Sequence, residues 1–552
     1  MARIRIVLLF VLLLNSLEGF SEQFAYRVNF RARTSDFTLA DSASFLSARA
    51  LARRANFSVV VDSSDLPLGR AFVDTVLART NGKLHLVSKW FNFCVVLVSD
   101  SIAMHHLDGL SIVSSYSLVG HYDTYLHNNP QSVNAGSFVA ARTTAHTGAY
   151  FGQTWVQTLI VKGNYLTDLG LNGNGKLIAV LDGGFSGTNT HPCFDSLRNA
   201  GRIVDHYNFV LDSTFVYSYD IHGTSVLSTI SANVPGAFVG TATGASIALY
   251  VSEDVNSEQP IELLNMVAAM ERADSLGADV ITSSLGYNTF DNSAFNFNFS
   301  SDFDGATTIA AKGANKAWSK GIFFCASAGN EGGGPWNRIL TPGDADSVMT
   351  IGSVDYAGHC PSTSGYGPNA AGQVKPDVCL LGEGAAVAWG TGYFNSNGTS
   401  FSTPQAAGWV ACLMQGNPTT RPSVIKNAII RCASEYLTPG NQLGYGIPDF
   451  QCIADSLPTT HIVELSKTPF AIELPNPVSS TVNIVVDVSS AQFVDFRITD
   501  ISGRLFTAFK SFVEAHSGSP ILVDVSSFSK GIYLLHAIST DGHQEVIKVL
   551  KD

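Results

Sequence analysis

"KLIAVLDGG", residues 176–184, is a short continuous apolar run that ends in an aspartate and two glycines. A run of this kind, without polar alternation, is typical of a strand buried on both faces of a sheet. Similar runs recur in "SIALYVSED", "GIFFCASAGN" and "VMTIGSVD", and the helical pattern "LLNMVAAMERADSL" lies among them. The alternation predicts an α/β fold, a parallel sheet covered by helices on both faces. In such sheets ligands bind at the carboxyl ends of the strands, where Asp182 stands.

The pattern of apolar and polar residues changes on both sides of this region. Residues 24–122 mix short strand patterns with one helical pattern and predict a small α+β module. A polar, aperiodic stretch from His127 to Gln153 predicts an exposed linker and a natural place for a cut. Beyond residue 457 the helical patterns stop, and alternating strands separated by turn signals predict a β-sandwich. We therefore expect four segments, residues 1–21, 22–145, 146–457 and 458–552.

The first segment, "MARIRIVLLFVLLLNSLEGFS", has two arginines before an apolar stretch and small residues after it. This pattern predicts a secretory signal peptide with cleavage after Ser21. No later segment has about 18 uninterrupted apolar residues, so we expect no integral membrane segment after signal removal. The formal net charge of −12 is spread without long basic runs, which argues against a nucleic-acid partner.

The eight cysteines of this exported chain do not reveal their pairing. Cys325 and Cys412 lie in apolar runs, where a buried thiol is expected, and Cys94 lies in the N-terminal segment. Five remain as candidates for disulfides: Cys193, Cys360, Cys379, Cys432 and Cys452.

Four residues have the chemistry of a nucleophilic site. Asp182 ends a predicted strand, and His222 in "DIHGTSVLSTISA" stands at a predicted helix start. Asn330 closes "CASAGNEG", and Ser400 in "GTSFSTPQAAG" precedes an apolar helical run. A nucleophilic serine needs a base, an acid that orients the base, and donors for an oxyanion. Taken singly, each residue also has an ordinary structural interpretation, as a turn residue, a structural histidine or an N-cap.

Taken together and in this order, the blocks "IAVLDGGF", "HGTSVLSTISA", "SSLGY", "ASAGNEG" and "GTSFSTPQAAG" resemble the subtilase family of serine proteases. The resemblance covers Leu169 to Ile453. It implies that Ser400 attacks the substrate and that His222 moves the proton. It also implies that Asp182 orients His222 and that the Asn330 side chain binds the oxyanion.

The same resemblance implies where the substrate binds. Ser284, Leu285 and Gly286 would form an edge strand that pairs with an extended peptide. The opposite wall of the primary specificity pocket would be Ala326, Ser327, Ala328 and Gly329. The chain departs from the family pattern at Ser225, where a second histidine is common, and at Phe401, where methionine is usual. Ile339 and Leu340 are larger than the residues that many relatives keep at the pocket floor.

The flanking segments also resemble known companions of this domain. Residues 24–122 have the size and position of a subtilase propeptide. The C-terminal segment, with "LPNP", "GIYLLHA" and a final "VIKVLKD", resembles a type IX secretion sorting domain. A generic β-sandwich adhesion module is the alternative for that segment. Together these resemblances imply a zymogen that is exported through the periplasm and becomes secreted or attached to the cell surface.

The expected activity is therefore that of a serine endopeptidase. Its expected partners are protein or peptide substrates, its own propeptide and the secretion machinery. No cofactor is required and no metal ligands are assigned, although calcium is allowed as a structural ion because "DFDG", residues 302–305, is a fragment of a calcium loop.

Two rival functions belong to other classes. The first is a binding or adhesion protein on a catalytically weak subtilase scaffold, which loss of any catalytic residue would favour. The second is a glycosidase that uses Asp254 and Glu258, which explains neither the serine block nor Asn330.

Overall fold

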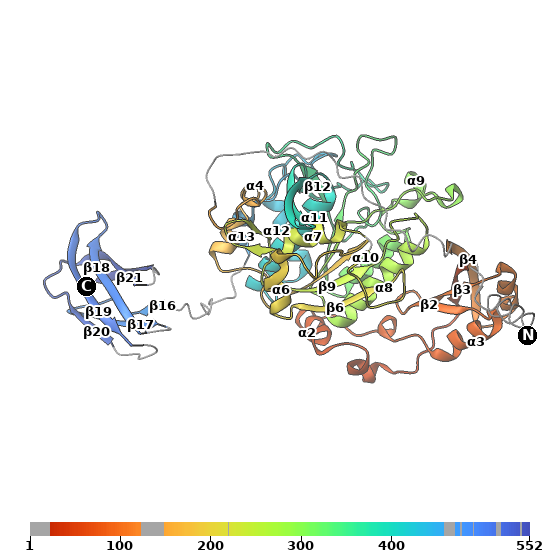
Figure 1. The fold of residues 1–552 in the computed structure, drawn as a ribbon, viewed down its shortest axis with the longest axis horizontal. Coiled ribbons are helices and arrows are strands. Elements are labelled where there is room, and N and C mark those ends of the chain that lie inside the picture. Colours follow the sequence, from red (N-terminus) through yellow and green to blue (C-terminus); the bar gives the residue numbers. More distant parts are fainter. Residues whose placement is uncertain are drawn as a thin grey trace, which may run out of the picture. The chain divides into compact units, whose positions relative to one another are not determined.

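The computed structural model describes residues 23–122, 148–218, 220–457, 470–474, 477–488, 491–514, 520–540 and 544–552. The predicted signal peptide, residues 1–21, and most of the predicted linker lie outside the described residues. The chain divides into two compact units, residues 1–460 and 461–552 (Figure 1).

The centre of the first unit is an α/β domain, residues 148–457, built on a seven-stranded parallel sheet of order β13-β12-β11-β10-β5-β9-β6. The expected α/β fold, with its buried parallel strands, is confirmed. Its strands are β5 (Leu177–Asp182), β6 (Ile203–Asn208), β9 (Ser246–Val251), β10 (Val280–Ser283), β11 (Phe323–Ser327), β12 (Met349–Val354) and β13 (Val378–Leu381).

Helices cover both faces of this sheet. The longer ones are α7 (His222–Ser231), α8 (Ile261–Leu276), α10 (Ile309–Ser319), α11 (Thr399–Gly416), α12 (Pro422–Arg431) and α13 (Phe450–Ser456). Shorter elements are α4 (Trp155–Leu159), α5 (Asn164–Asp168), α6 (Asp195–Asn199) and α9 (Phe299–Asp302), with the ribbons β7 (Asn233–Val234)–β8 (Phe238–Val239) and β14 (Ala385–Trp389)–β15 (Gly392–Ser396).

Alternate residues of β5 show how the two faces are packed. Ile178 and Val180 belong to the core formed with α7 and α11, whereas Ala179 and Leu181 belong to the core formed with α8 and α10. Side chains of a strand point alternately to opposite faces, so a continuous apolar run fills both cores. The carboxyl ends of β5, β9, β10 and β11 consequently meet at one edge of the sheet.

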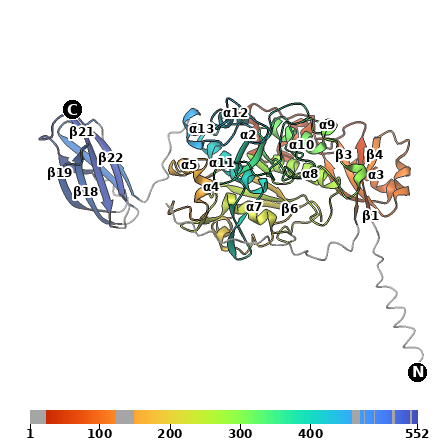
Figure 2. The ribbon, with the colours of Figure 1, turned by 90° about the horizontal axis from the view of Figure 1, so that it is seen from above.

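The N-terminal module, residues 23–122, is α+β as expected. Its four-stranded antiparallel sheet has the order β2-β3-β1-β4, with β1 (Gln23–Phe30), β2 (Lys83–Ser88), β3 (Phe93–Val98) and β4 (Val113–Tyr122). This sheet packs on α8, where Leu86 and Val95 share a core cluster with Leu264 (Figure 2). Its helices are α2 (Ala48–Phe57) and α3 (Arg70–Thr80).

Helix α2 joins the N-terminal module to the α/β domain through buried charges. Arg53 and Arg54, both on α2, pair with Asp274 of α8, and the Arg54 Nη2 to Asp274 Oδ2 distance is 2.7 Å. Lys320 Nζ lies 2.9 Å from Asp65 Oδ2, and Asp65 also accepts from Arg54. Phe57, at the end of α2, belongs to the same core cluster as α11. The module is thus attached through both apolar and charged side chains.

The second unit, residues 461–552, contains two antiparallel sheets. The orders are β16-β17-β20 and β19-β18-β21-β22, with β16 (Phe470–Glu473), β17 (Thr481–Val488), β18 (Gln492–Asp500), β19 (Leu505–Val513), β20 (Pro520–Asp524), β21 (Gly531–Ser539) and β22 (Gln544–Lys551). A core that includes Ile484, Phe496 and Leu535 joins side chains of both sheets. The expected C-terminal β-sandwich is therefore present.

The cysteine pairing that the sequence left open is resolved in part. Cys432, just after α12, forms a disulfide with Cys452 of α13. Cys325 and Cys412 are free and buried, as expected, and the remaining described cysteines are free thiols. In the described residues, no helix is both long and apolar enough to cross a membrane.

Candidate active site

Asp182 and His222 meet at the carboxyl edge of the parallel sheet. Asp182 is the last residue of β5 and is fully buried, and its Oδ1 lies 2.7 Å from Nδ1 of His222, the first residue of α7. Oδ1 also accepts from the Gly183 N–H at 2.8 Å. A carboxylate on Nδ1 fixes the tautomer that leaves Nε2 free to accept a proton.

Glycine allows α7 to begin this close to β5. A Cβ atom at Gly223 would lie 2.3 Å from the carbonyl oxygen of Gly184 and 3.0 Å from Cβ of Asp182. Asp220 caps the same helix start, because its Oδ1 accepts from the His222 N–H at 3.1 Å. The backbone thus holds the imidazole against the buried carboxylate.

Burial lowers the pKa of His222, but the Asp182 carboxylate outweighs that effect by its charge and its hydrogen bond. Glu253 and Asp220 add further negative charge, and together they raise the pKa of His222 to about 9. The imidazolium form is therefore stabilised, which is the form that a general base acquires during the reaction.

Ser400 is the second residue of α11 and is almost fully buried. Its Oγ donates to the carbonyl oxygen of Ser284 at 3.4 Å, and the Ser284 hydroxyl donates to the Ser400 carbonyl at 2.9 Å. The ring of Phe401 lies 5.9 Å from the His222 ring, which brings the start of α11 beside the imidazole. Among the described residues, no hydrogen bond joins Ser400 Oγ to His222.

The turn before α11 needs glycine. Gly398 has φ 144°, a conformation that other residues rarely adopt, and a Cβ there would lie 3.5 Å from Nδ2 of Asn330. The N–H groups of the first turn of a helix have no partner within the helix, so the Ser400 N–H can bind an anion.

Asn330 is held with its amide nitrogen free. Its Oδ1 accepts from the Thr399 N–H at 2.9 Å and from the Thr399 hydroxyl at 3.1 Å, which assigns the other terminal atom as the Nδ2 donor. Two donors, Nδ2 of Asn330 and the N–H of Ser400, are therefore available at the start of α11.

A cavity of about 590 Å³ opens beside these groups. His222 and Asn330 line it, as do the predicted substrate-binding residues Ser284, Leu285, Gly286, Ser327 and Gly329. Ala326 and Ala328, predicted for the same wall, are fully buried and do not line the cavity.

Leu340 closes the space between the two predicted walls. A Cβ at Gly286 would lie 2.7 Å from Cβ of Leu340, and one at Gly329 would lie 2.5 Å from its Cγ. Both glycines are required because the leucine side chain occupies this space.

The sequence interpretation missed most of the charge in this cavity. Its lining includes Asp220, Glu253, Asp254, Glu258, Asp291 and Glu331. Only Asp254 and Glu258 were considered, as a glycosidase pair. The acidic density of "SEDVNSEQPIE", between β9 and the start of α8, could have indicated Glu253, whereas Asp220, Asp291 and Glu331 come from separate segments without such a signal.

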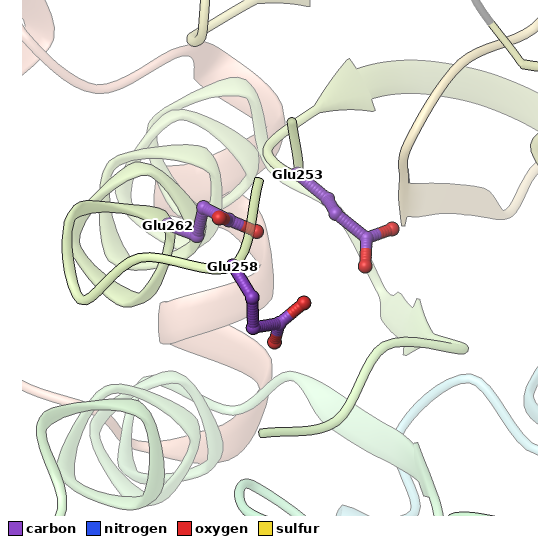
Figure 3. Close-up of side chains that lie close together, drawn as sticks. All are labelled: Glu253, Glu258 and Glu262. Atoms are coloured by element: carbon purple, nitrogen blue, oxygen red, sulfur yellow. The ribbon is translucent and has the colours of Figure 1, made fainter. Parts of the chain in front are cut away.

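The calcium-loop fragment predicted from the sequence is an ordinary turn, and a different group of carboxylates lies close together. In the fragment "DFDG", Asp304 accepts from the Ala306 and Thr307 N–H groups and from the Thr307 hydroxyl, as a turn residue does. In contrast, Glu253, Glu258 and Glu262 offer oxygen atoms within 4.8 Å of one another (Figure 3).

Three segments of the chain match models of known protein families. Residues 173–446 match the model of the Subtilase family, residues 25–134 that of the Peptidase S8 propeptide domain of Bacteroidota, and residues 474–552 that of the Secretion system C-terminal sorting domain. Subtilisin DY of Bacillus licheniformis is 27% identical over 290 residues, which are 52% of this chain and 93% of that protein.

Two further proteins are similar over the same region. The thermophilic serine proteinase of Bacillus sp. (strain AK1) is 28% identical over 286 residues, 51% of this chain and 62% of that protein. The solved structure of the prenylagaramide maturation protease PagA is 22% identical, with a TM-score of 0.42, and the match covers 53% of this chain and 97% of that one.

Proposed function

Because residues 173–446 of this chain form a subtilase domain, we propose that the protein is a secreted serine endopeptidase that cleaves peptide bonds through an acyl-enzyme on Ser400. The observation that carries this proposal is the 2.7 Å hydrogen bond between buried Asp182 and His222, at the mouth of a cavity that Asn330 also lines.

In the proposed mechanism, Ser400 Oγ attacks the carbonyl carbon of the scissile bond and His222 Nε2 takes the hydroxyl proton. The imidazolium then delivers that proton to the leaving amine, and Asp182 stabilises the positive ring. The tetrahedral oxygen is bound by Nδ2 of Asn330 and the N–H of Ser400. Water releases the acyl group by the same steps in reverse, again with His222 as base.

The flanking segments support a secreted zymogen. The propeptide match over residues 25–134 and the sorting-domain match over residues 474–552 are those of an exported precursor. We propose the signal peptide at residues 1–21, the propeptide and linker at 22–145, the peptidase domain at 146–457 and the sorting domain at 458–552. Export passes through the periplasm to the cell surface or the medium.

A fluorophosphonate label tests the chemistry directly, since it reacts with an activated serine only. We expect the label on Ser400 by peptide mass mapping, and none on the Ser400→Ala variant. A correctly folded, processed protein that hydrolyses no peptide and takes no label would instead support a binding protein on a subtilase scaffold.

A further inference from the structure

The cavity beside His222 is strongly acidic. Six carboxylates line it, and among the described residues no lysine or arginine does. A peptide that lies in this cavity against Ser284–Gly286 therefore meets several carboxylates.

Three glutamates near this wall are arranged to bind a cation. Glu253 follows β9, Glu258 lies in the connecting loop and Glu262 lies in the first turn of α8. One oxygen of each lies within 4.8 Å of the others, and their carboxylates converge (Figure 3). In the described part of the chain, neither Glu258 nor Glu262 has a basic side chain among the groups that shift its pKa.

Two buried polar atoms, one in the trio and one on Tyr287, lack hydrogen-bond partners in the described part of the chain. Glu262 is 1% exposed, and although its Oε1 accepts from the Gln259 N–H at 2.8 Å, its Oε2 has no partner in the described residues. The hydroxyl of Tyr287 is equally buried and also lacks a partner there. Burial raises the pKa of that hydroxyl, and the charges of the three glutamates raise it further.

A buried polar atom without a hydrogen-bond partner lowers the stability of the fold unless a ligand pairs with it. Burial raises the pKa of Glu253 to about 8 and that of Glu258 to about 7, so an unoccupied trio tends to keep protons. An arriving cation would replace those protons and supply donors to the orphaned oxygens.

We propose that Glu253, Glu258 and Glu262 form a subsite of the substrate cleft that binds the ammonium or guanidinium group of a lysine or arginine side chain. That side chain belongs to the peptide on the acyl side of the scissile bond. This subsite rests on the proposed peptidase function and names a substrate class for it.

The position of Glu253 and Glu258 favours a peptide side chain over a metal ion, and Glu262 lies buried behind them, outside the cavity lining. Glu253 and Glu258 line the same cavity as His222 and the predicted substrate strand, and Val255 and Leu285 offer apolar contacts there for an aliphatic stem. A guanidinium group has five donors and can bind several carboxylates at once.

The test uses peptides that differ at one position on the acyl side, with arginine, lysine, norleucine or glutamate there. Norleucine keeps the length of lysine without its charge. We expect the wild-type kcat/KM for arginine to exceed that for norleucine by roughly 10- to 100-fold at one position, as a charge-assisted hydrogen bond allows. We expect Glu258→Gln and Glu262→Gln each to remove most of this ratio.

Glu331→Gln is the matched control, because it removes a cavity carboxylate outside the trio. It should keep most of the arginine-to-norleucine ratio. An equal loss in all three variants would show a general effect of negative charge and would overturn the subsite. Equal kcat/KM values for arginine and norleucine in the wild type would also overturn it, while hydrolysis of both would leave the peptidase function standing.

Binding of the same peptides to the Ser400→Ala variant, measured by calorimetry, tests the subsite without turnover. Tighter binding of the arginine peptide, weakened by Glu258→Gln in this background, supports the proposal. A calcium chloride titration gives the competing outcome: calcium binding that Glu262→Gln abolishes, without any preference for arginine, would overturn the subsite in favour of a metal site.

Discussion

Two groups of carboxylates stand at the same edge of the parallel sheet, after the neighbouring strands β5 and β9. Asp182 ends β5 and pairs with His222 and the Gly183 N–H, both supplied by the chain. Glu253 follows β9 and lies close to Glu258 and Glu262, and neither Glu258 nor Glu262 has a basic side chain among the described groups that shift its pKa. Asp182 and Glu262 are buried, whereas Glu253 and Glu258 are partly exposed. We infer that a carboxylate paired within the chain serves the chain's own site, whereas carboxylates without a basic partner remain available to a ligand.

The largest effect is expected from removing the charge of Asp182. Asp182→Asn should lower kcat by about 10⁴-fold, because an amide favours the wrong tautomer of His222. Steady-state hydrolysis of one peptide, with circular dichroism to confirm folding, measures this. A fall in kcat of less than about tenfold would contradict the proposed role of Asp182 in orienting His222.

Asp274 extends the comparison to the stability of the fold, since this carboxylate is buried together with its partners Arg53 and Arg54. Asp274→Ala should lower the free energy of unfolding by about 3–5 kcal/mol, because it leaves the buried Arg53 guanidinium without a carboxylate and Arg54 with Asp65 alone. Denaturation in the Ser400→Ala background, followed by tryptophan fluorescence, measures the change, since all six tryptophans lie in the first unit.

The matched control for Asp274 is Lys162→Ala, which breaks the pair with Asp449 on the surface, where the lysine side chain is 54% exposed. That change should cost about 0–1 kcal/mol. Equal costs for the two variants would contradict the view that burial makes the internal pairing of Asp274 significant.

Asn330→Ala tests the predicted oxyanion donor at the start of α11. It should lower kcat by about 10²- to 10³-fold with little change in KM, because the Nδ2 donor acts on the oxyanion of the transition state. A rise in KM at constant kcat would place Asn330 with the cleft residues that bind the ground state of the substrate.

The smallest expected effect is a shift in the pH profile of kcat/KM, which links Glu253 to the Asp182–His222 pair. The base must be neutral, so kcat/KM of the wild type should rise with pH through the pKa of His222, about 9. Glu253, whose own pKa is about 8, is ionised there and is one of the charges that raise the pKa of His222, with Asp182 and Asp220. Glu253→Gln should therefore move the rising limb to lower pH. A limb that stays in place would show that the two groups act independently.

Local patterns predicted much of this fold because each pattern reports on one element. The apolar run at 176–181 predicted β5, and "HGTSVLS" predicted a helix that begins at His222; the structure has both. The roles assigned to Asp182, His222, Asn330 and Ser400 stay predictions that these variants test.

What the sequence could not reveal depends on contacts between distant residues. Arg53 and Asp274 are 221 positions apart, and nothing near Arg53 indicates a buried partner. Leu340 was noted for its size, but its place between Gly286 and Gly329 follows from three separate segments. Likewise, Tyr287 reads as part of a substrate strand and only the fold brings its hydroxyl to the glutamates.

Helix α2 has a consequence for when the enzyme becomes active. The N-terminal module cannot lift away as a lid does, because its departure must carry Phe57 out of the α/β core and return Arg53 and Arg54 to water together. Charged groups that separate in an apolar setting lose their attraction before they regain hydration, which makes such a departure slow. We therefore expect a delay between cutting of the linker and departure of the module.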